Sequence, residues 1–105
     1  MQSGDTNAYS GDKIRIEVLN DGTSNKNFTT VVDILNQSGY SVIRAGNYVG
    51  ESDNYSKIIN HTTDMDSLEI SERLSQILGI SKLETSSDTS AEVDFTIILG
   101  PKYEL

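Results

Sequence analysis

Alternating apolar and polar residues mark the beginning and the end of the patterned part of the chain. At 13–19 the apolar side of the alternation holds Ile14, Ile16 and Val18, and the mixed side holds Arg15, Glu17 and Leu19. At 93–99 the apolar side holds Val93, Phe95, Ile97 and Leu99, and the mixed side holds Asp94, Thr96 and Ile98. A period of two residues is typical of a β-strand with one buried face. We therefore expect a strand at each end, with one face toward a core.

Two segments between these strands have the three- and four-residue apolar spacing of an amphipathic helix. The first is predicted from a cap at Ser24 or Asn25 to about Ser38, with a stripe made of Phe28, Val31, Val32 and Leu35. The second is predicted from a cap at Thr63, Asp64 or Asp66 to Leu78, with a stripe made of Ile70, Leu74, Ile77 and Leu78. A glycine follows each segment, Gly39 or Gly79, and glycine readily adopts the left-handed conformation that ends a helix.

The remaining segments complete a repeated strand-helix-strand order. Strands are predicted at about 41–48, with a bulge or bend near Gly46 and Gly50, and at about 55–60. The polar segment 81–92 is predicted to be a long surface loop. The expected fold is α/β (α+β), a two-layer βαββαβ sandwich whose four-stranded, mainly antiparallel sheet has both helices on one face. The other sheet face, with its mixed residues, would be open to solvent.

Composition narrows the class of partner. The 105 residues suffice for one domain with a modest core, and their formal net charge of −8 argues against binding to nucleic acid or to anionic lipid. The absence of cysteine excludes disulfides and thiolate chemistry. Residues 1–12 are predicted to be a linker or a cloning remnant, and they lack the basic and apolar regions of a signal peptide. The chain is therefore either cytoplasmic or a fragment whose export signal lies upstream.

Several short motifs make the chain resemble a known family. They are Ile16-Glu17-Val18-Leu19-Asn20 with Gly22-Thr23, Leu35 with Gly39-Tyr40-Ser41-Val42, Ser56-Lys57-Ile58-Ile59, Leu74 with Leu78-Gly79, and Val93 to Gly100 followed by Tyr103. They span residues 13–103, which resemble the LytR C-terminal domain of LytR-CpsA-Psr cell-envelope proteins, named as transcriptional attenuators. The resemblance implies a bacterial, extracytoplasmic accessory domain, anchored in the membrane or associated with the cell wall through residues outside this chain. Asp21, between Asn20 and Gly22, departs from the usual family sequence.

Few residues offer chemistry, and each has a structural alternative. His61 is the only histidine, and although it could bind a metal with Asp64 or Asp66, a surface or helix-capping role is the prediction. Acidic residues at the start of the second helix suit the helix dipole better than a calcium site. The loop after Asn20 precedes a helix N-terminus that could bind an anion, but it lacks the glycine pattern of a phosphate loop. We expect no catalytic residue, no metal site and no cofactor, so an enzyme is the least favoured function.

The mixed sheet face and the nearby tyrosines form the predicted ligand or partner surface. Its residues are Arg15, Glu17, Leu19, Asn20, Tyr48, Tyr55 and Thr96. Aromatic rings can stack on sugars or on partner side chains. The leading hypothesis is a non-catalytic domain that binds cell-wall glycan or an envelope protein. The alternative is a protein-interaction or homodimerisation module without a glycan ligand, because exposed strand edges can pair across a two-fold axis.

Overall fold

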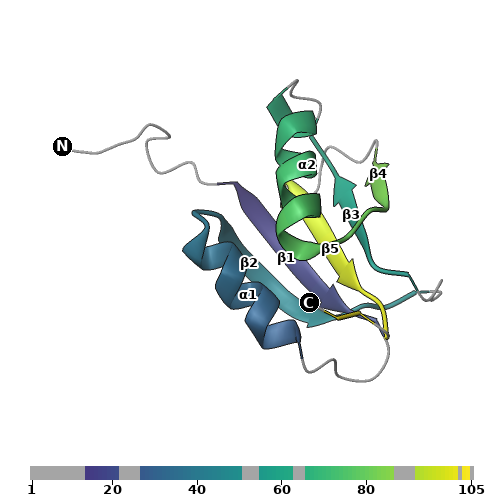
Figure 1. Cartoon of the computed structure of the whole chain (residues 1–105). Coiled ribbons are helices and arrows are strands. Elements are labelled where there is room, and N and C mark those ends of the chain that lie inside the picture. The colour runs from purple at the N-terminus through teal and green to yellow at the C-terminus, as the bar shows by residue number, and fades with distance from the viewer. Residues whose placement is uncertain are drawn as a thin grey trace.

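A computed structural model of the chain describes residues 14–21, 27–50, 55–62, 66–86, 92–101, 103 and 104. Within these ranges two helices lie against a five-stranded sheet (Figure 1). In chain order the elements are β1 (Arg15–Asn20), α1 (Phe28–Gln37), β2 (Ser41–Asn47), β3 (Lys57–Asn60), α2 (Asp66–Leu78), β4 (Leu83–Thr85) and β5 (Phe95–Leu99). The predicted linker 1–12, the loop residues 22–24 and 51–54, and the proposed caps Ser24, Asn25, Thr63 and Asp64 lie outside the described residues.

The sheet has the strand order β2-β1-β5-β3-β4. Strand β1 is parallel to both β2 and β5, β4 is parallel to β3, and β3 runs antiparallel to β5. The predicted α+β sandwich is therefore confirmed, but the strand directions differ from the mainly antiparallel prediction, since three of the four pairings are parallel. The fifth strand, β4, lies inside the segment 81–92 that was predicted to be a loop. A period of two reports a buried face, and it carries no information about strand direction.

Both helices cover the same face of the sheet, and the main core lies between them and the strands (Figure 1). The sheet contributes Ile16 and Val18 from β1, Ile58 from β3, and Phe95, Ile97 and Leu99 from β5. The helices contribute Val31, Leu35, Leu74 and Leu78, each at most 1% exposed. Complete burial of one such side chain is worth roughly 1.5–3 kcal/mol, so these contacts supply most of the driving force for folding. The helical stripes are confirmed except at Ile77, which is 37% exposed.

Glycines end both helices, as their positions predicted. Gly39 has φ +97° and Gly79 has φ +69°, both in the left-handed region that glycine adopts without a steric cost. After Gly39, the Tyr40 amide donates to the Leu35 carbonyl over 3.1 Å, and the Tyr40 side chain joins the core. The chain is thereby turned back so that β2 can enter the sheet beside β1.

A register shift between β1 and β2 decides which side chains reach the open face. Ile16 pairs with Val42, whereas Glu17 pairs with Arg44, so Ile43 is an extra residue in β2. Ile43 is 49% exposed, and Arg44 takes the position on the helix-free face beside Glu17. The bulge or bend predicted near Gly46 and Gly50 is confirmed as a bend at Gly50, where φ is +151°, whereas the bulge itself lies at Ile43 and the pairing of Leu19 with Gly46 is regular. Without the extra residue, alternation would turn Arg44 toward the helices.

Candidate functional site

The helix-free face of the sheet brings together side chains from three neighbouring strands. The register places Arg44, Glu17 and Thr96 in one row across β2, β1 and β5. The next row holds Gly46, Leu19 and Ile98. Alternation along each strand turns these residues away from the core that the helices cover. Over β5 this face is buried, since Thr96 is 5% and Ile98 is 2% exposed, so its accessible part lies over β1 and β2.

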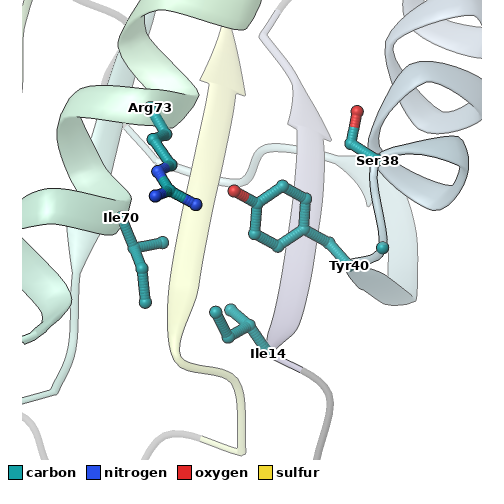
Figure 2. A pocket seen from close by; sticks show the side chains of 6 residues that line it. Ile14, Ser38, Tyr40, Ile70 and Arg73 are labelled. Carbon is teal, nitrogen blue, oxygen red and sulfur yellow. The ribbon is translucent and has the colours of Figure 1, made fainter.

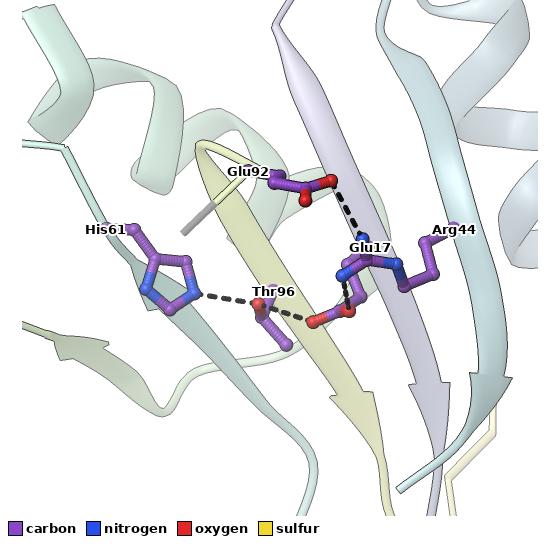
Figure 3. A network of polar contacts seen from close by, with 5 residues as sticks. All are labelled: Glu17, Arg44, His61, Glu92 and Thr96. Carbon is purple, nitrogen blue, oxygen red and sulfur yellow. Dashed lines mark hydrogen bonds and ion pairs between the residues drawn. The ribbon is translucent and has the colours of Figure 1, made fainter. Parts of the chain in front are cut away.

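A continuous polar network runs across this face (Figure 3). Arg44 donates from Nη1 to Glu17 Oε2 over 3.0 Å and from Nη2 to Glu92 Oε2 over 3.1 Å. The Thr96 hydroxyl donates to Glu17 Oε1 over 3.1 Å, and His61 Nε2 lies 2.7 Å from Thr96 Oγ1. His61 directly follows β3 and Glu92 shortly precedes β5, so the network ties four chain segments together. It holds Glu17 and Arg44 in fixed positions on the surface.

The direction of these hydrogen bonds fixes the tautomer of His61. A carboxylate only accepts, so Thr96 gives its proton to Glu17, and its oxygen must accept from His61 Nε2–H. Nδ1 of a neutral His61 is then an acceptor, and this buried atom has no hydrogen-bond partner among the described residues. Thr96 is only 5% exposed, so its hydroxyl serves the network and does not face solvent as a nucleophile would.

His61 therefore differs from the sequence-based expectation. The predicted surface or helix-capping role is wrong, because the ring spans from the end of β3 to Thr96 on β5. The described residues contain no group of three or more His, Asp or Glu side chains placed to hold a metal ion. Asp64, one of the metal partners considered from sequence, lies outside the described residues.

Ion pairs neutralise the charges of this face locally. Arg15 pairs with Asp94 over 3.4 Å, and Lys57 pairs with Glu84 over 3.8 Å, in addition to the pairs of Arg44. The hydrogen bond and the attraction from Glu17, followed by the attraction from Glu92, raise the pKa of the Arg44 guanidinium. Arg44 is thus a permanently charged donor between two acceptors. The face is consequently polar and zwitterionic, and it does not have one dominant sign of charge.

The other residues of the predicted surface are spread over the molecule. Asn20 is 4% exposed and follows Ile16 and Val18 on the helix-covered face, so it does not belong to the open face. Tyr48 is half-buried at the end of β2. Tyr55 is 65% exposed, and the Lys82 ammonium lies 5.3 Å from its ring centroid. Of the seven predicted residues, the structure brings Arg15, Glu17, Leu19 and Thr96 onto the helix-free face, and the alternation of β2 places Tyr48 at the edge of the same face.

Sequence reasoning missed Arg44 and Glu92, and it considered His61 without placing it in this network. The sequence contains no local signal for Arg44, because its orientation depends on the bulge at Ile43. Glu92 and His61 join the network through pairings between segments far apart in the chain. The alternation in β1 and β5 gave Glu17 and Thr96, and a search for polar residues at the ends of the neighbouring strands would have added His61 and Glu92.

A separate pocket of about 260 Å³ lies on the helical side, between the end of α1 and the middle of α2 (Figure 2). It is lined by Ile14, Ser38, Gly39, Tyr40, Ile70 and Arg73. Arg73 forms an ion pair with Glu69 over 2.9 Å, one helical turn away. Ligand pockets are commonly about 300–1,000 Å³, so this pocket has room for little more than one small ring or side chain. None of the seven predicted surface residues lines it.

Comparison with protein families identifies the chain. The family model described as LytR cell envelope-related transcriptional attenuator matches residues 13–103. The comparison with curated proteins found no match, and neither did the comparison with solved structures. Within the described residues, neither helix has the length and the apolar run that crossing a membrane requires. With nearly all of its residues covered by the match, the chain belongs to the LytR C-terminal family, the non-catalytic accessory domain of LytR-CpsA-Psr cell-envelope proteins.

Proposed function

We propose that this accessory domain binds cell-wall glycan or an envelope protein through the helix-free face of its sheet. The observation that supports this is the ordered network of Arg44, Glu17, Thr96 and His61 on that face. The opposite face is fully used by the two helices, whereas this face presents fixed donors and acceptors beside Leu19. A partner that docks here completes the third layer over the sheet.

Preorganisation favours binding on this face. Immobilising a long side chain on binding costs roughly 0.5–1.5 kcal/mol, and the carboxylates of Glu17 and Glu92 already hold Arg44 in place. Glu17 is likewise held by Thr96 and Arg44, and its side chain keeps 15% of its surface exposed. The side chains of Arg44 and Glu17 are therefore already ordered in the folded domain, before a partner binds. A partner gains the hydrogen bonds without that loss.

The family and the charge support the cellular setting that we propose for the domain. A domain of a cell-envelope protein works on the outer side of a bacterial membrane, held there by an anchor outside this chain. The net charge of −8 disfavours direct attachment to anionic lipid headgroups. In this setting the domain positions a catalytic partner domain on its substrate, and it does no chemistry itself.

Retention on purified peptidoglycan tests the proposal. The wild-type domain should sediment with peptidoglycan more than an unrelated acidic domain of the same size. Arg44→Ala should reduce retention several-fold, because it removes the donor that bridges Glu17 and Glu92. Arg73→Ala is the matched control, because Arg73 is equally a surface arginine but lies on α2. Equal retention of the wild type and the unrelated domain would eliminate the glycan ligand.

Self-association through the sheet edge is the second candidate. Strand β2 is at the edge of the sheet, and Ile43 is 49% exposed there. Exposed edges can pair with a second copy across a two-fold axis, although a bulge such as that at Ile43 weakens such pairing. Sedimentation velocity over a wide concentration range separates the two functions. A dimer that Ile43→Lys dissociates would support this candidate, and a strict monomer at high concentration would rule it out.

A further inference from the structure

Beyond the bulge, every second residue of β2 lies on the helix-free face, in a line along the strand. The register places Arg44 beside Glu17 and Gly46 beside Leu19. The Tyr48 amide donates to the Asn20 carbonyl over 2.9 Å, so the ladder continues past Asn47. Alternation therefore places Tyr48 on the same face as Arg44 and Gly46. This line along β2 has the Arg44 guanidinium at one end, the Tyr48 ring at the other and no side chain at Gly46 between them.

Because Gly46 has no side chain, the space above it in the middle of this line is unfilled. A Cβ added to Gly46 would meet no atom within 4 Å. The backbone of Gly46 does not require glycine, because its φ is not in the left-handed region. Across the sheet, Gly46 is followed by Leu19, which is partly buried, and then by Ile98, which is only 2% exposed, so Leu19 is the apolar side chain that borders the position. The position above Gly46 is therefore open space on β2, which we call the depression, with the Gly46 backbone below it and Leu19 beside it.

Both ends of the depression are held in place. A Cβ built on Gly50 would lie 2.8 Å from the Tyr48 hydroxyl oxygen, so the ring packs closely on the backbone of Gly50. At the other end, Arg44 is held by carboxylates at 3.0 and 3.1 Å. Glu17 Oε2 accepts from Arg44 and Glu17 Oε1 accepts from the Thr96 hydroxyl, and each oxygen retains a further lone pair. A fixed donor and a fixed acceptor therefore stand side by side at one end.

This combination matches an uncharged sugar ring better than an ionic ligand. Vicinal hydroxyls of a pyranose act as donor and acceptor together, and its C–H face packs on apolar and aromatic surface. The cations of the face are already paired with carboxylates, which leaves no excess positive charge to attract an anion. The net charge of −8 adds to the repulsion of acidic ligands.

We propose that one neutral pyranose ring of a glycan lies over Gly46 between Arg44 and Tyr48. Its hydroxyls accept from Arg44 and donate to Glu17, and its apolar face lies on Leu19 and the Gly46 backbone. This inference rests on the proposed function and names the ligand class and the exact strand position for it. Gly46 is then a specificity-determining residue, because any side chain there occupies the volume of the sugar.

A matched pair of valine substitutions tests this position. Gly46→Val fills the depression, and Ala45→Val adds similar bulk to the adjacent residue, which points to the other side of β2 and is exposed. Valine suits a strand, so both variants should fold, and this is checked by their thermal unfolding. The probe is the soluble, uncharged β-1,4-linked tetramer of N-acetylglucosamine, titrated into labelled protein and followed by amide chemical shifts.

The tetramer should shift the amides of Leu19, Gly46 and Tyr48 in the wild type. Gly46→Val should weaken binding by about tenfold or more, which corresponds to one steric clash of about 1.4 kcal/mol, while Ala45→Val should bind as the wild type does. Retention on peptidoglycan is measured for the same three proteins. Loss of retention only in Gly46→Val completes the expected result.

Each other outcome overturns a defined part of the inference. If Gly46→Val stays on peptidoglycan as well as the wild type, the sugar position is wrong and the proposed function stands. If Gly46→Val loses retention but the tetramer causes no shifts, the position is right and the ligand class is wrong. Shifts confined to Tyr40 and Arg73 would move the sugar to the pocket on the helical side. If the wild type itself is not retained and does not bind the tetramer, the glycan function and this inference fail together.

Discussion

Replacing Tyr103 with phenylalanine isolates one buried hydrogen bond at the end of a helix. The Tyr103 hydroxyl donates to the carbonyl of Leu78 over 2.6 Å. Leu78 is the last residue of α2, and the final carbonyls of a helix have no partner within the helix. Tyr103 is 8% exposed, so water does not replace the lost hydroxyl easily. Tyr103→Phe therefore leaves the rest of the ring packing in place and removes only the donor.

The expected loss of stability follows from that burial. A hydrogen bond contributes about 0.5–1.5 kcal/mol, and a buried carbonyl left without a donor costs about 1–3 kcal/mol. We expect Tyr103→Phe to lower the free energy of unfolding by about 1–2 kcal/mol at pH 7. For a domain of this size that corresponds to a decrease in Tm of about 5–10 °C. Chemical denaturation followed by circular dichroism gives the free energy, and Tyr55→Phe at an exposed site should change it by less than about 0.5 kcal/mol.

The same variant has a defined pH dependence. Burial raises the pKa of the Tyr103 hydroxyl in the folded state above its ordinary value of 10.0. Between the unfolded and the folded pKa, the unfolded state holds fewer protons, so stability falls as pH rises. The contribution of Tyr103 is complete below about pH 10 and is lost through the folded pKa. The difference in stability between the wild type and Tyr103→Phe should accordingly shrink from pH 8 to pH 11. A difference below about 0.3 kcal/mol at pH 7, or one that grows toward pH 11, would refute this reasoning.

Three further substitutions test other parts of the structure. Leu74→Ala removes a fully buried side chain of α2 and should cost about 2–5 kcal/mol in denaturant unfolding, whereas Leu68→Ala, at an exposed site on the same helix, should cost far less. Thr96→Val removes the hydroxyl between His61 and Glu17 and should cost about 1–3 kcal/mol, and an unchanged Tm would show that the network is not formed in solution. Gly39→Ala should lower the free energy of unfolding by about 1 kcal/mol because φ there is +97°. Gly46→Ala should leave it unchanged or raise it slightly, because a Cβ there meets no atom. If Gly46→Ala melted at a lower temperature than Gly39→Ala, the assigned backbone conformations would be contradicted.

Local patterns in the sequence were enough to predict the layers of the fold. The alternation at Ile16 and Val18 gave the buried face of β1, and the spacing of Val31 and Leu35 gave the buried stripe of α1. These predictions hold because burial acts on each element with the period of its own backbone, two residues in a strand and 3.6 in a helix. Glycine ended both helices for an equally local reason, the low cost of a positive φ.

The tertiary structure alone decided the strand order and the contents of the open face. The sequence predicted Glu17 and Thr96 as surface residues, but only the pairing of β1 with β5 brings them within 3.1 Å. Arg44 reaches them because one extra residue at Ile43 turns β2, and His61 arrives from the end of β3. Register and strand order depend on contacts between segments far apart in the chain, whose energies are set by the whole core. The periodicity within a single segment therefore determines which face is buried, and the assembled sheet determines which side chains meet on the face left open.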